Sequence, residues 1–337
     1  MSVSIESSQL KKRPNAHLTN LQLRWTLFKR KYASSTGVKH ILVRIVMYLL
    51  VMGLAFVFLY PFLYMMTTSL MSNSDLNSSS VNWIPTEVKF ENYAIAMQLI
   101  NGLDYAKNSL FVTLVATFGH IIVCSFVGYG FARYNFPLKK ILFSCVMLAF
   151  IVPTQTIIIP LYLTYSNLNW LDSYVPLLVP TFFGFGLRGA LYIFLFRQFF
   201  LTVPKSLEEA ARIDGCGFMM TYWRIVFPLA KATVVVAMVL SVVWHWNDFY
   251  EPGLYVSSPA LSFLPPRLGA IIEAASAQPD QQAEMLRQLG LEDGEDTLNN
   301  AVVMAGAVII SAPVLVFFAF AQRQFMQGIE RTGITGE

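Results

Sequence analysis

The sequence predicts an all-α polytopic membrane protein with six transmembrane helices, and three observations lead to this fold class. Hydrophobic residues make up 55% of the 337 residues and charged residues only 13%, about half the charged share of an average soluble domain. The mean hydropathy is +0.53. Six separate runs match the roughly 20 apolar residues of a membrane-spanning helix. The apolar content excludes a disordered chain, and three cysteines are too few for a disulfide-rich scaffold.

Polar segments separate the predicted spans, so that their limits can be read along the chain. The first run is too long for a cleavable signal peptide and follows roughly forty polar and basic residues, so we expect it to remain as a membrane anchor. Arg188 is the charge near the middle of the fourth span, and Lys231 lies at the start of the fifth. The six spans are expected at residues 45–70, 108–132, 141–165, 175–199, 228–250 and 300–322.

Lys and Arg residues are concentrated on one side of this topology. Nineteen of the 24 lie in the N-terminal tail, the turn after span two, the loop between spans four and five, and the C-terminal tail. Because cytoplasmic segments are enriched in Lys and Arg, both termini are expected in the cytoplasm. The N-terminal basic residues either set this orientation alone or also contact anionic lipid. The expected domains are a basic tail over 1–44, a six-helix membrane domain over 45–325 and a C-terminal tail over 326–337.

Three extracytoplasmic connections follow from this topology. The first, 71–107, is polar and is expected to contain a short helix at 90–103, and the second, 166–174, is short. The third, 251–299, begins with turn-forming Pro and Gly residues. Its stretch from Asp280 to Asp296 carries six acidic residues and is either a solvated loop or a surface for an extracellular partner.

The cytoplasmic loop at 200–228 has the pattern of two short helices joined at a glycine. Pro204 suits a first helical turn, and Glu208 and Glu209 follow where carboxylates interact well with the positive end of the helix dipole. Gly215 can adopt the left-handed conformation that ends a helix. The residues expected to contact another protein are Glu208, Glu209, Ala210, Ala211, Asp214, Gly215, Ile225 and Pro228.

The same loop resembles the EAA loop of ABC importer permeases. The residues Glu209-Ala210-Ala211, Gly215, Ile225 and Pro228 stand at the family's spacing, with Phe227 in place of the usual leucine. The Asp214-Gly215 pair is similar to the carbohydrate branch, and the whole chain looks closest to maltose-type inner-membrane permeases over about 45–255 and 299–337. Other matching segments are Asn108-Ser109-Leu110, Gly130-Phe131-Ala132-Arg133, Pro153-Thr154-Gln155 and Trp246-Asn247-Asp248-Phe249.

This resemblance implies the type I ABC importer permease fold and a transport subunit rather than an enzyme. The implied assembly holds a second, different permease, two copies of a cytoplasmic ATPase docked on the EAA loop, and an extracytoplasmic sugar-binding protein, in a bacterial inner membrane and without nucleic acid. ATP and Mg²⁺ are expected on the ATPase. The chain itself has no Gly-Lys dipeptide, and therefore no G-x-x-x-x-G-K-[ST] phosphate loop, so no cofactor or metal is expected in it.

Two other function classes are alternatives to a sugar importer. A membrane enzyme needs a nucleophile with its base, or metal ligands, at depth, but the sequence has no H-E-x-x-H, no G-x-S-x-G and no intramembrane carboxylate pair. An importer of amino acids, phosphate or metal keeps the architecture and changes only the cargo. Which sugar is carried is left open by the sequence.

Arg188 is the first candidate for contact with a substrate. A charge near the centre of a bilayer costs about 2.5–3.5 kcal/mol and usually faces a bundle interior or a watery cavity. The flanking Gly184, Gly186 and Gly189 indicate an irregular helix at this point. Arg188 is expected either to line the translocation path and bind a hydroxyl or acidic group, or to form a structural ion pair with Asp248 or Glu251.

Further path candidates lie in spans three and five. Polar side chains after Pro153 either satisfy a freed backbone carbonyl or bind a sugar, and aromatic side chains near the outer end of span five either stack on sugar rings or belong to an interfacial belt. His120 and His245 are expected to serve packing. The additional path candidates are Gln155, Trp244, Trp246, Asn247 and Asp248.

Overall fold

A computed structural model describes residues 35–78, 83–186, 188–288 and 298–333 of the chain. Throughout these ranges the secondary structure consists of helices and turns, without strands. By compactness the chain divides into two units, Met1–Tyr64 and Met65–Glu337. Most of the predicted N-terminal tail, residues 289–296 of the acidic stretch and the last four residues lie outside the described residues.

The described part of the first unit is a single helix. Helix α2 (Ser35–Thr68) includes most of the first predicted span, and its residues up to Tyr64 belong to this unit. Phe56, Tyr60 and Tyr64 form a ladder along it, with ring centroids 6.0 and 6.5 Å apart. Apolar residues occupy every face of α2, as expected of a helix surrounded by lipid.

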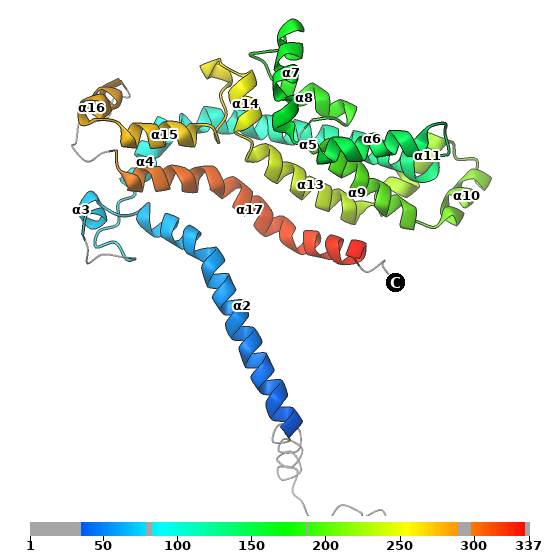
Figure 1. Ribbon diagram of the computed structural model, residues 1–337, viewed down its shortest axis with the longest axis horizontal. Coiled ribbons are helices and arrows are strands. Elements are labelled where there is room, and N and C mark those ends of the chain that lie inside the picture. The colour runs from blue at the N-terminus through cyan, green and yellow to red at the C-terminus, as the bar shows by residue number, and fades with distance from the viewer. Residues whose placement is uncertain (1–34, 79–82, 187, 289–297, 334–337) are drawn as a thin grey trace, which may run out of the picture. The chain divides into compact units, whose positions relative to one another are not determined.

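Long apolar helices form the centre of the second unit (Figure 1). Helix α5 packs on α9 and α13, and α13 packs on α17. The approach of α5 to α9 depends on Gly128, because a Cβ atom there would lie 2.8 Å from the Cβ of Phe196. These helices are α5 (Gly102–Arg133), α9 (Gly189–Thr202), α13 (Lys231–Trp246) and α17 (Asn300–Gly333).

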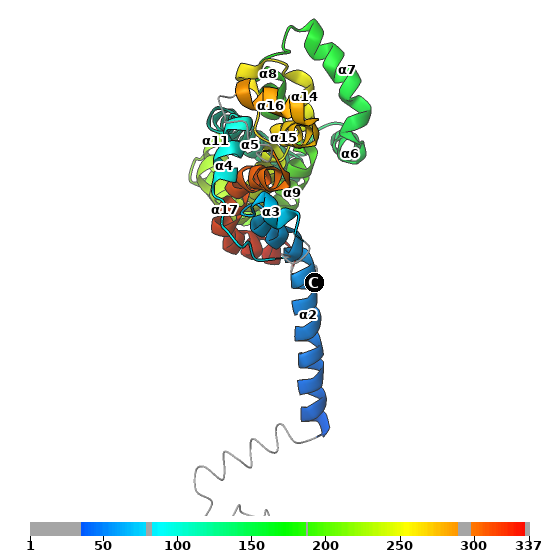
Figure 2. The same ribbon diagram turned by 90° about the vertical axis from the view of Figure 1, so that its left-hand side faces the viewer.

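Two of the predicted spans are sharply bent. The third consists of α6 (Lys139–Ile151) and α7 (Thr154–Asn167), whose axes differ by 101°. The bend lies at Val152, which is extended because Pro153 follows it. Figure 2 shows α6 and α7 along one side of the other helices. In the fifth, the segment 218–229 meets α13 at 77°; it consists of α11 (Phe218–Thr221), η2 (Tyr222–Val226) and α12 (Phe227–Leu229).

The fourth predicted span is interrupted, so the expectation of one helix over 175–199 is wrong. The structure has α8 (Val175–Leu178), η1 (Val179–Phe183) and then α9 from Gly189. The predicted irregularity at the glycines is confirmed, since Gly184, Gly186 and Arg188 have φ values of 70°, 94° and 64°. An L-residue such as Arg188 rarely adopts this left-handed conformation.

The structure bears out an α-helical membrane protein without fixing the number of spans. Helices α2, α5 and α17 are each long and apolar enough to cross a bilayer, and the two bent pairs raise the total to as many as five. Helix α9 is apolar but has only 14 residues. The six-span count and the orientation of the termini therefore remain predictions.

The α10–α11 loop and the α15–α16 segment lie at opposite ends of the second unit. Figure 1 shows α10 (Lys205–Ile213) and α11 at one end and α15 and α16 at the other. The helix expected at 90–103 is shorter, because Asn101 turns the chain with φ 48° between α4 and α5. The remaining short helices are α3 (Asn73–Leu76), α4 (Glu91–Leu99), α14 (Tyr250–Tyr255), η3 (Pro259–Leu261), α15 (Arg267–Ser276) and α16 (Pro279–Gln288).

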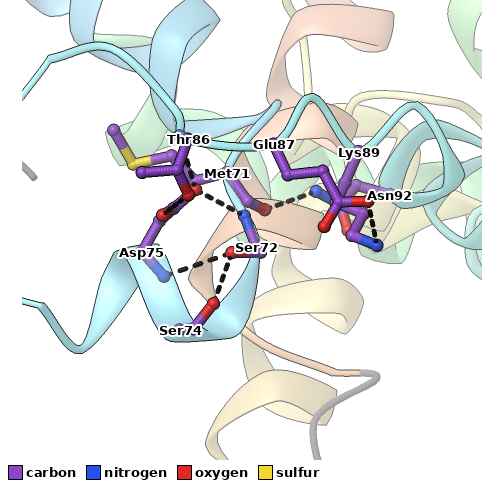
Figure 3. Close-up of polar contacts among 8 residues, drawn as sticks. All are labelled: Met71, Ser72, Ser74, Asp75, Thr86, Glu87, Lys89 and Asn92. Carbon is purple, nitrogen blue, oxygen red and sulfur yellow. Dashed lines mark hydrogen bonds and ion pairs between the residues drawn. The ribbon is translucent and has the colours of Figure 1, made fainter.

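Hydrogen bonds fold the first predicted extracytoplasmic loop onto itself (Figure 3). Asp75, in α3, accepts hydrogen bonds from the backbone N–H and the hydroxyl of Thr86. Ser72 caps α3 by accepting from the N–H of Asp75 at 3.2 Å. Asn92 donates to the carbonyls of Ser69 and Met71, both at 3.0 Å. The hydroxyl bond from Thr86 is the main reason why the pKa of Asp75 lies below its usual value.

Candidate functional site

The loop between α9 and α13 forms the two short helices that the sequence predicts. Pro204 stands at the N-cap of α10. At the other end Gly215 has φ 80°, the N–H of Cys216 donates to the carbonyl of Ala211 at 2.9 Å, and the N–H of Gly215 donates to that of Arg212 at 3.0 Å. This pair of bonds is a Schellman motif. Gly215 therefore ends α10 and directs the chain into α11.

The two neighbouring glutamates of α10 have opposite surroundings. Glu209 and Ala210 are exposed, whereas Glu208 and Ala211 are buried. The Oε1 atom of Glu208 lies 2.7 Å from Nε of Arg133, so this carboxylate has an intramolecular partner. Glu208 is thus not presented to another protein, which departs from the grouping of both glutamates as contact residues. The other predicted contact residues are exposed at Asp214, Gly215 and Pro228 and half-buried at Ile225.

Large apolar side chains surround the exposed part of this loop. Ile213 is 86% exposed and Met219 56%, although apolar side chains of this size normally lie inside a protein. Exposed apolar side chains of this size occur at surfaces that contact another protein or a membrane. The other exposed members of the loop's apolar surface are Leu207, Phe218, Met220 and Trp223.

The second helix of the loop is anchored to α5 by aromatic packing. The hydroxyl of Tyr222 lies 2.7 Å from that of Ser125, and both residues are buried. The ring of Tyr222 also packs against Tyr129 at 5.2 Å between centroids, and Phe218 stacks on Tyr129 at 5.8 Å. The loop is therefore fixed to the membrane helices, while its outer surface stays free.

A cavity of about 730 Å³ lies between α6, α7 and α9. It brings together Gln155 and Arg188, two of the predicted path residues, and adds Thr154 and Glu251. Most of the remaining wall is apolar, with a few polar groups, which is the usual composition of a small-molecule site. Sequence reasoning named Glu251 only as an ion-pair partner, because its position on the cavity wall depends on the placement of α14.

The guanidinium of Arg188 stacks on an aromatic ring. Its Cζ lies 4.3 Å from the ring centroid of Trp244, a cation–π contact. Throughout the described part of the chain no carboxylate lies within 4.0 Å of Arg188, so the ion pair considered with Asp248 or Glu251 is not formed. Arg188 also lines the 730 Å³ cavity, and a guanidinium can donate hydrogen bonds to a ligand bound there.

The remaining candidates of span five do not line this cavity. Trp246 is only 4% exposed and its indole N–H donates to the carbonyl of Ile310 at 2.9 Å, so its polar group has a partner within the chain. Asn247 donates to the carbonyl of Val243 at 2.8 Å. Asp248 accepts from the N–H groups of Tyr250 and Glu251 and so starts α14.

A second, smaller cavity of about 30 Å³ lies beside the first. Asp248, Glu251 and His245 are among its lining residues, and Glu251 belongs to both cavities. Removal from water, together with the neighbouring charge of Asp248, raises the pKa of Glu251 from 4.5 to about 8. Glu251 is therefore largely protonated at neutral pH and can donate a hydrogen bond.

The two histidines pack against each other with their rings tilted by 48°, and packing is the role expected from the sequence. The ring centroids of His120 and His245 lie 5.2 Å apart. Nε2 of His120 lies 3.1 Å from the carbonyl oxygen of Phe185, so it donates to the backbone just before Arg188. Among the described residues no cluster of three or more His, Cys, Asp or Glu side chains has the arrangement of a metal site.

Residues 124–331 match the family described as "Binding-protein-dependent transport system inner membrane component". The arabinooligosaccharides transport system permease protein AraQ of Bacillus subtilis (strain 168) is 27% identical over 298 residues, which are 87% of this chain and 96% of AraQ. The sn-glycerol-3-phosphate transport system permease protein UgpE of Yersinia enterocolitica is 31% identical over 222 residues, 66% of this chain and 70% of UgpE.

One solved structure shares the fold over most of the chain. It is the crystal structure of a bacterial ABC transporter involved in the import of the acidic polysaccharide alginate. The TM-score is 0.69 at 22% sequence identity, covering 87% of this chain and 98% of the other. The helical arrangement described above is therefore one that a known transporter subunit adopts.

Proposed function

Because the chain belongs to the family of binding-protein-dependent transport system inner membrane components, we propose that it is the permease subunit of an ATP-driven importer of a sugar or oligosaccharide. The relative matched over most of its length, AraQ, is named for arabinooligosaccharides. UgpE, named for sn-glycerol-3-phosphate, is matched over a shorter part and makes a polyol phosphate the second candidate cargo. As a transport subunit the chain hydrolyses no ATP by itself.

The proposed assembly is a heterodimer of this chain with a second permease, bound to two copies of a cytoplasmic ATPase and served by an extracytoplasmic sugar-binding protein. ATP and Mg²⁺ are bound by the ATPase, and this chain carries no cofactor. The chain crosses a bacterial inner membrane with both termini in the cytoplasm. Closure of the ATPase on ATP moves the α10–α11 loop, and the permease pair then opens to the outside, receives the sugar, and resets.

The observation that carries this proposal is the loop formed by α10 and α11. It presents Glu209, Ala210 and the Schellman turn at Gly215 on one surface, next to the exposed apolar side chains around Ile213. Figure 1 places this surface at the end of the second unit opposite to α15 and α16. Such a combination of one charge, a small residue and apolar side chains suits docking into a groove.

Co-purification with the ATPase tests the proposal. The wild-type chain is expected to retain the ATPase, whereas Glu209→Lys and Gly215→Asp are expected to lose it. Gly215→Asp acts through backbone strain, because no atom lies within 4 Å of a Cβ at this position. The matched control is Glu273→Lys, the same charge change on an exposed residue of α15, which should retain the ATPase. A wild-type chain that recruits no ATPase would refute the proposal.

The 730 Å³ cavity is proposed as part of the path for the cargo, with Arg188 and Gln155 donating hydrogen bonds to it. The cargo class is identified by comparing growth when a sugar is the sole carbon source with growth when a polyol phosphate, an amino acid or a metal is the limiting nutrient. Arg188→Gln should then lower uptake at unchanged expression, whereas Lys107→Gln, at an exposed surface ion pair, should not. Normal uptake by Arg188→Gln would remove Arg188 from the path.

A further inference from the structure

The end of α5 that contacts the α10–α11 loop carries a buried ion pair. Nε of Arg133, the last residue of α5, lies 2.7 Å from Oε1 of Glu208, and the two side chains are only 4% and 9% exposed. The atoms lack the alignment of a hydrogen bond, so their attraction is mainly Coulombic. It acts in surroundings less polar than water, which strengthens it.

Arg133 makes a second contact with another helix. Its Nη2 donates to the carbonyl oxygen of Val203, the residue that ends α9. The planar guanidinium carries several N–H donors in a fixed arrangement, so it can bind two acceptors at once. Arg133 therefore joins three elements at one point: the end of α5, the end of α9 and the first turn of α10.

Helices α5 and α9 are themselves closely joined near this point. A Cβ atom on Gly128 would lie 2.8 Å from the Cβ of Phe196 and 3.0 Å from the backbone nitrogen of Arg197. Separation or sliding of the two helices would open this contact. A displacement applied to the end of α5 is therefore shared by α9, which carries Arg188 at its N-terminal end and forms a wall of the cavity.

We infer that Arg133 and Glu208 are positioning residues that transmit movement of the α10–α11 loop to α5 and α9, while Glu209 is the glutamate that meets the ATPase. This inference rests on the proposed coupling of the loop to an ATPase. A buried ion pair contributes little net stability compared with an apolar pair of similar size. It does fix the distance between its two helices, and that is what transmission of a displacement requires.

The test uses the complete importer with its ATPase in proteoliposomes, and Cys145 as the reporter. This thiol is exposed and lines the 730 Å³ cavity. It forms a mixed disulfide with a small thiosulfonate, which releases a sulfinate, and the rate of this modification reports movement of the cavity walls. Cys216 is replaced by serine to remove the thiol in the loop. Wild type is expected to change its Cys145 modification rate by about fivefold or more when Mg·ATP is added.

The decisive variant is the double neutral one, Arg133→Gln with Glu208→Gln. Replacing one partner leaves the other as an unpaired buried charge, whereas replacing both does not. The double variant should therefore reach the same amount in the membrane as wild type and retain the ATPase. Its Cys145 should no longer respond to Mg·ATP. Lys205→Gln, which removes an exposed charge from the same helix, is the matched control and should respond normally.

Each other outcome overturns the inference. A double variant that responds to Mg·ATP shows that the pair transmits nothing, and one that fails to accumulate shows a role in folding only. Loss of the ATPase from the double variant would show that Glu208 or Arg133 contacts the ATPase directly. A wild type that retains the ATPase without any Cys145 response shows that the helices do not move with the loop. If the wild-type chain does not co-purify with the ATPase, the proposed function is refuted instead. Co-purification alone decides this, without the Cys145 measurement.

Discussion

Glu251 is a carboxyl group whose protonation links stability to pH. Its pKa is raised from 4.5 to about 8, mainly because it is removed from water and secondarily by Asp248. The folded state therefore binds a proton more tightly than the unfolded state. For such a group the stability is greatest below the unfolded pKa, falls as the pH rises from about 4.5 to about 8, and is constant above that.

Glu251→Gln removes this dependence, because an amide is neutral at every pH. Wild type should lose thermal stability relative to Glu251→Gln between about pH 5 and about pH 8, and the two proteins should converge toward the acidic end of the range. Melting curves in detergent at several pH values measure this difference. Glu273→Gln, at an exposed residue of α15, is the control, and curves for wild type and Glu251→Gln that stay parallel over the whole range would contradict the expectation.

Single residues also mark the limit of what sequence reasoning could predict at the site. The motif identified the loop and the positions of Glu209 and Gly215 correctly as an exposed residue and a helix-ending residue. It could not separate Glu208 from Glu209, because two consecutive helical residues differ by about 100° in direction and the buried direction is set by Arg133. The hydrogen bond of Trp246 was not predictable either, since its acceptor, the carbonyl of Ile310, is distant in the sequence.

At the scale of helices, the close contact of α5 with α9 predicts an effect on stability, and a second glycine of α5 serves as the control. Gly128→Ala places a methyl group against Phe196 and the backbone of α9, whereas Gly130→Ala meets no atom within 4 Å. Overpacking of this kind costs about 1–3 kcal/mol, so Gly128→Ala should lower the melting temperature in detergent. Gly130→Ala should leave it unchanged, and equal melting temperatures for the two variants would show that the helices do not approach closely here.

The loop that connects α2 to α5 depends on Asp75. Asp75→Ala removes the acceptor for both the N–H and the hydroxyl of Thr86, so residues 71–92 should be cleaved faster by an added protease. The exposed Glu87 is the control, because Glu87→Ala leaves these bonds intact. Acidification should act in the same direction, since the lowered pKa of Asp75 means that this stabilisation is lost as the pH falls through its folded value.

The helices themselves were predictable where one helix contains an uninterrupted apolar run. Helices α2, α5 and α17 contain the first, second and sixth expected spans nearly whole. The other spans are bent or broken, at Pro153, at the glycines before Arg188 and near Pro228. Pro and Gly identify these points in the sequence, but the angles of 101° and 77° are set by packing against other helices, which no local pattern encodes.

For the whole molecule, the orientation in the membrane is the main prediction left to test. Cys216 lies in the α10–α11 loop, and Ser276 is an exposed residue of α15 at the opposite end of the second unit. In a chain without Cys124 and Cys145, a membrane-impermeant maleimide should label Cys216 only in inside-out vesicles. The same chain with Ser276→Cys and Cys216→Ser should be labelled only from the outside. Labelling of both from one side would overturn the predicted topology.

For the whole molecule, the sequence predicted the class of protein better than it predicted the arrangement of residues around the cavity. Composition alone indicated a membrane protein, and the spacing of one loop pointed to the family that the comparison later matched over residues 124–331. The cavity was not predictable, since its wall combines Gln155 of α7, Arg188 before α9 and Glu251 of α14. These residues are brought together only by the breaks in the helices.

The contacts of Arg133 also bear on how this chain tolerates insertions and deletions during evolution. Arg133 holds Val203 and Glu208 at the same time, so the number of residues between them is fixed. One residue inserted there would rotate the rest of α10 by about 100°, turning the buried carboxylate outward and burying a neighbour in its place. Substitutions on the outer surface of the loop leave this register intact. The segment should therefore accept changes of residue far more readily than changes of length.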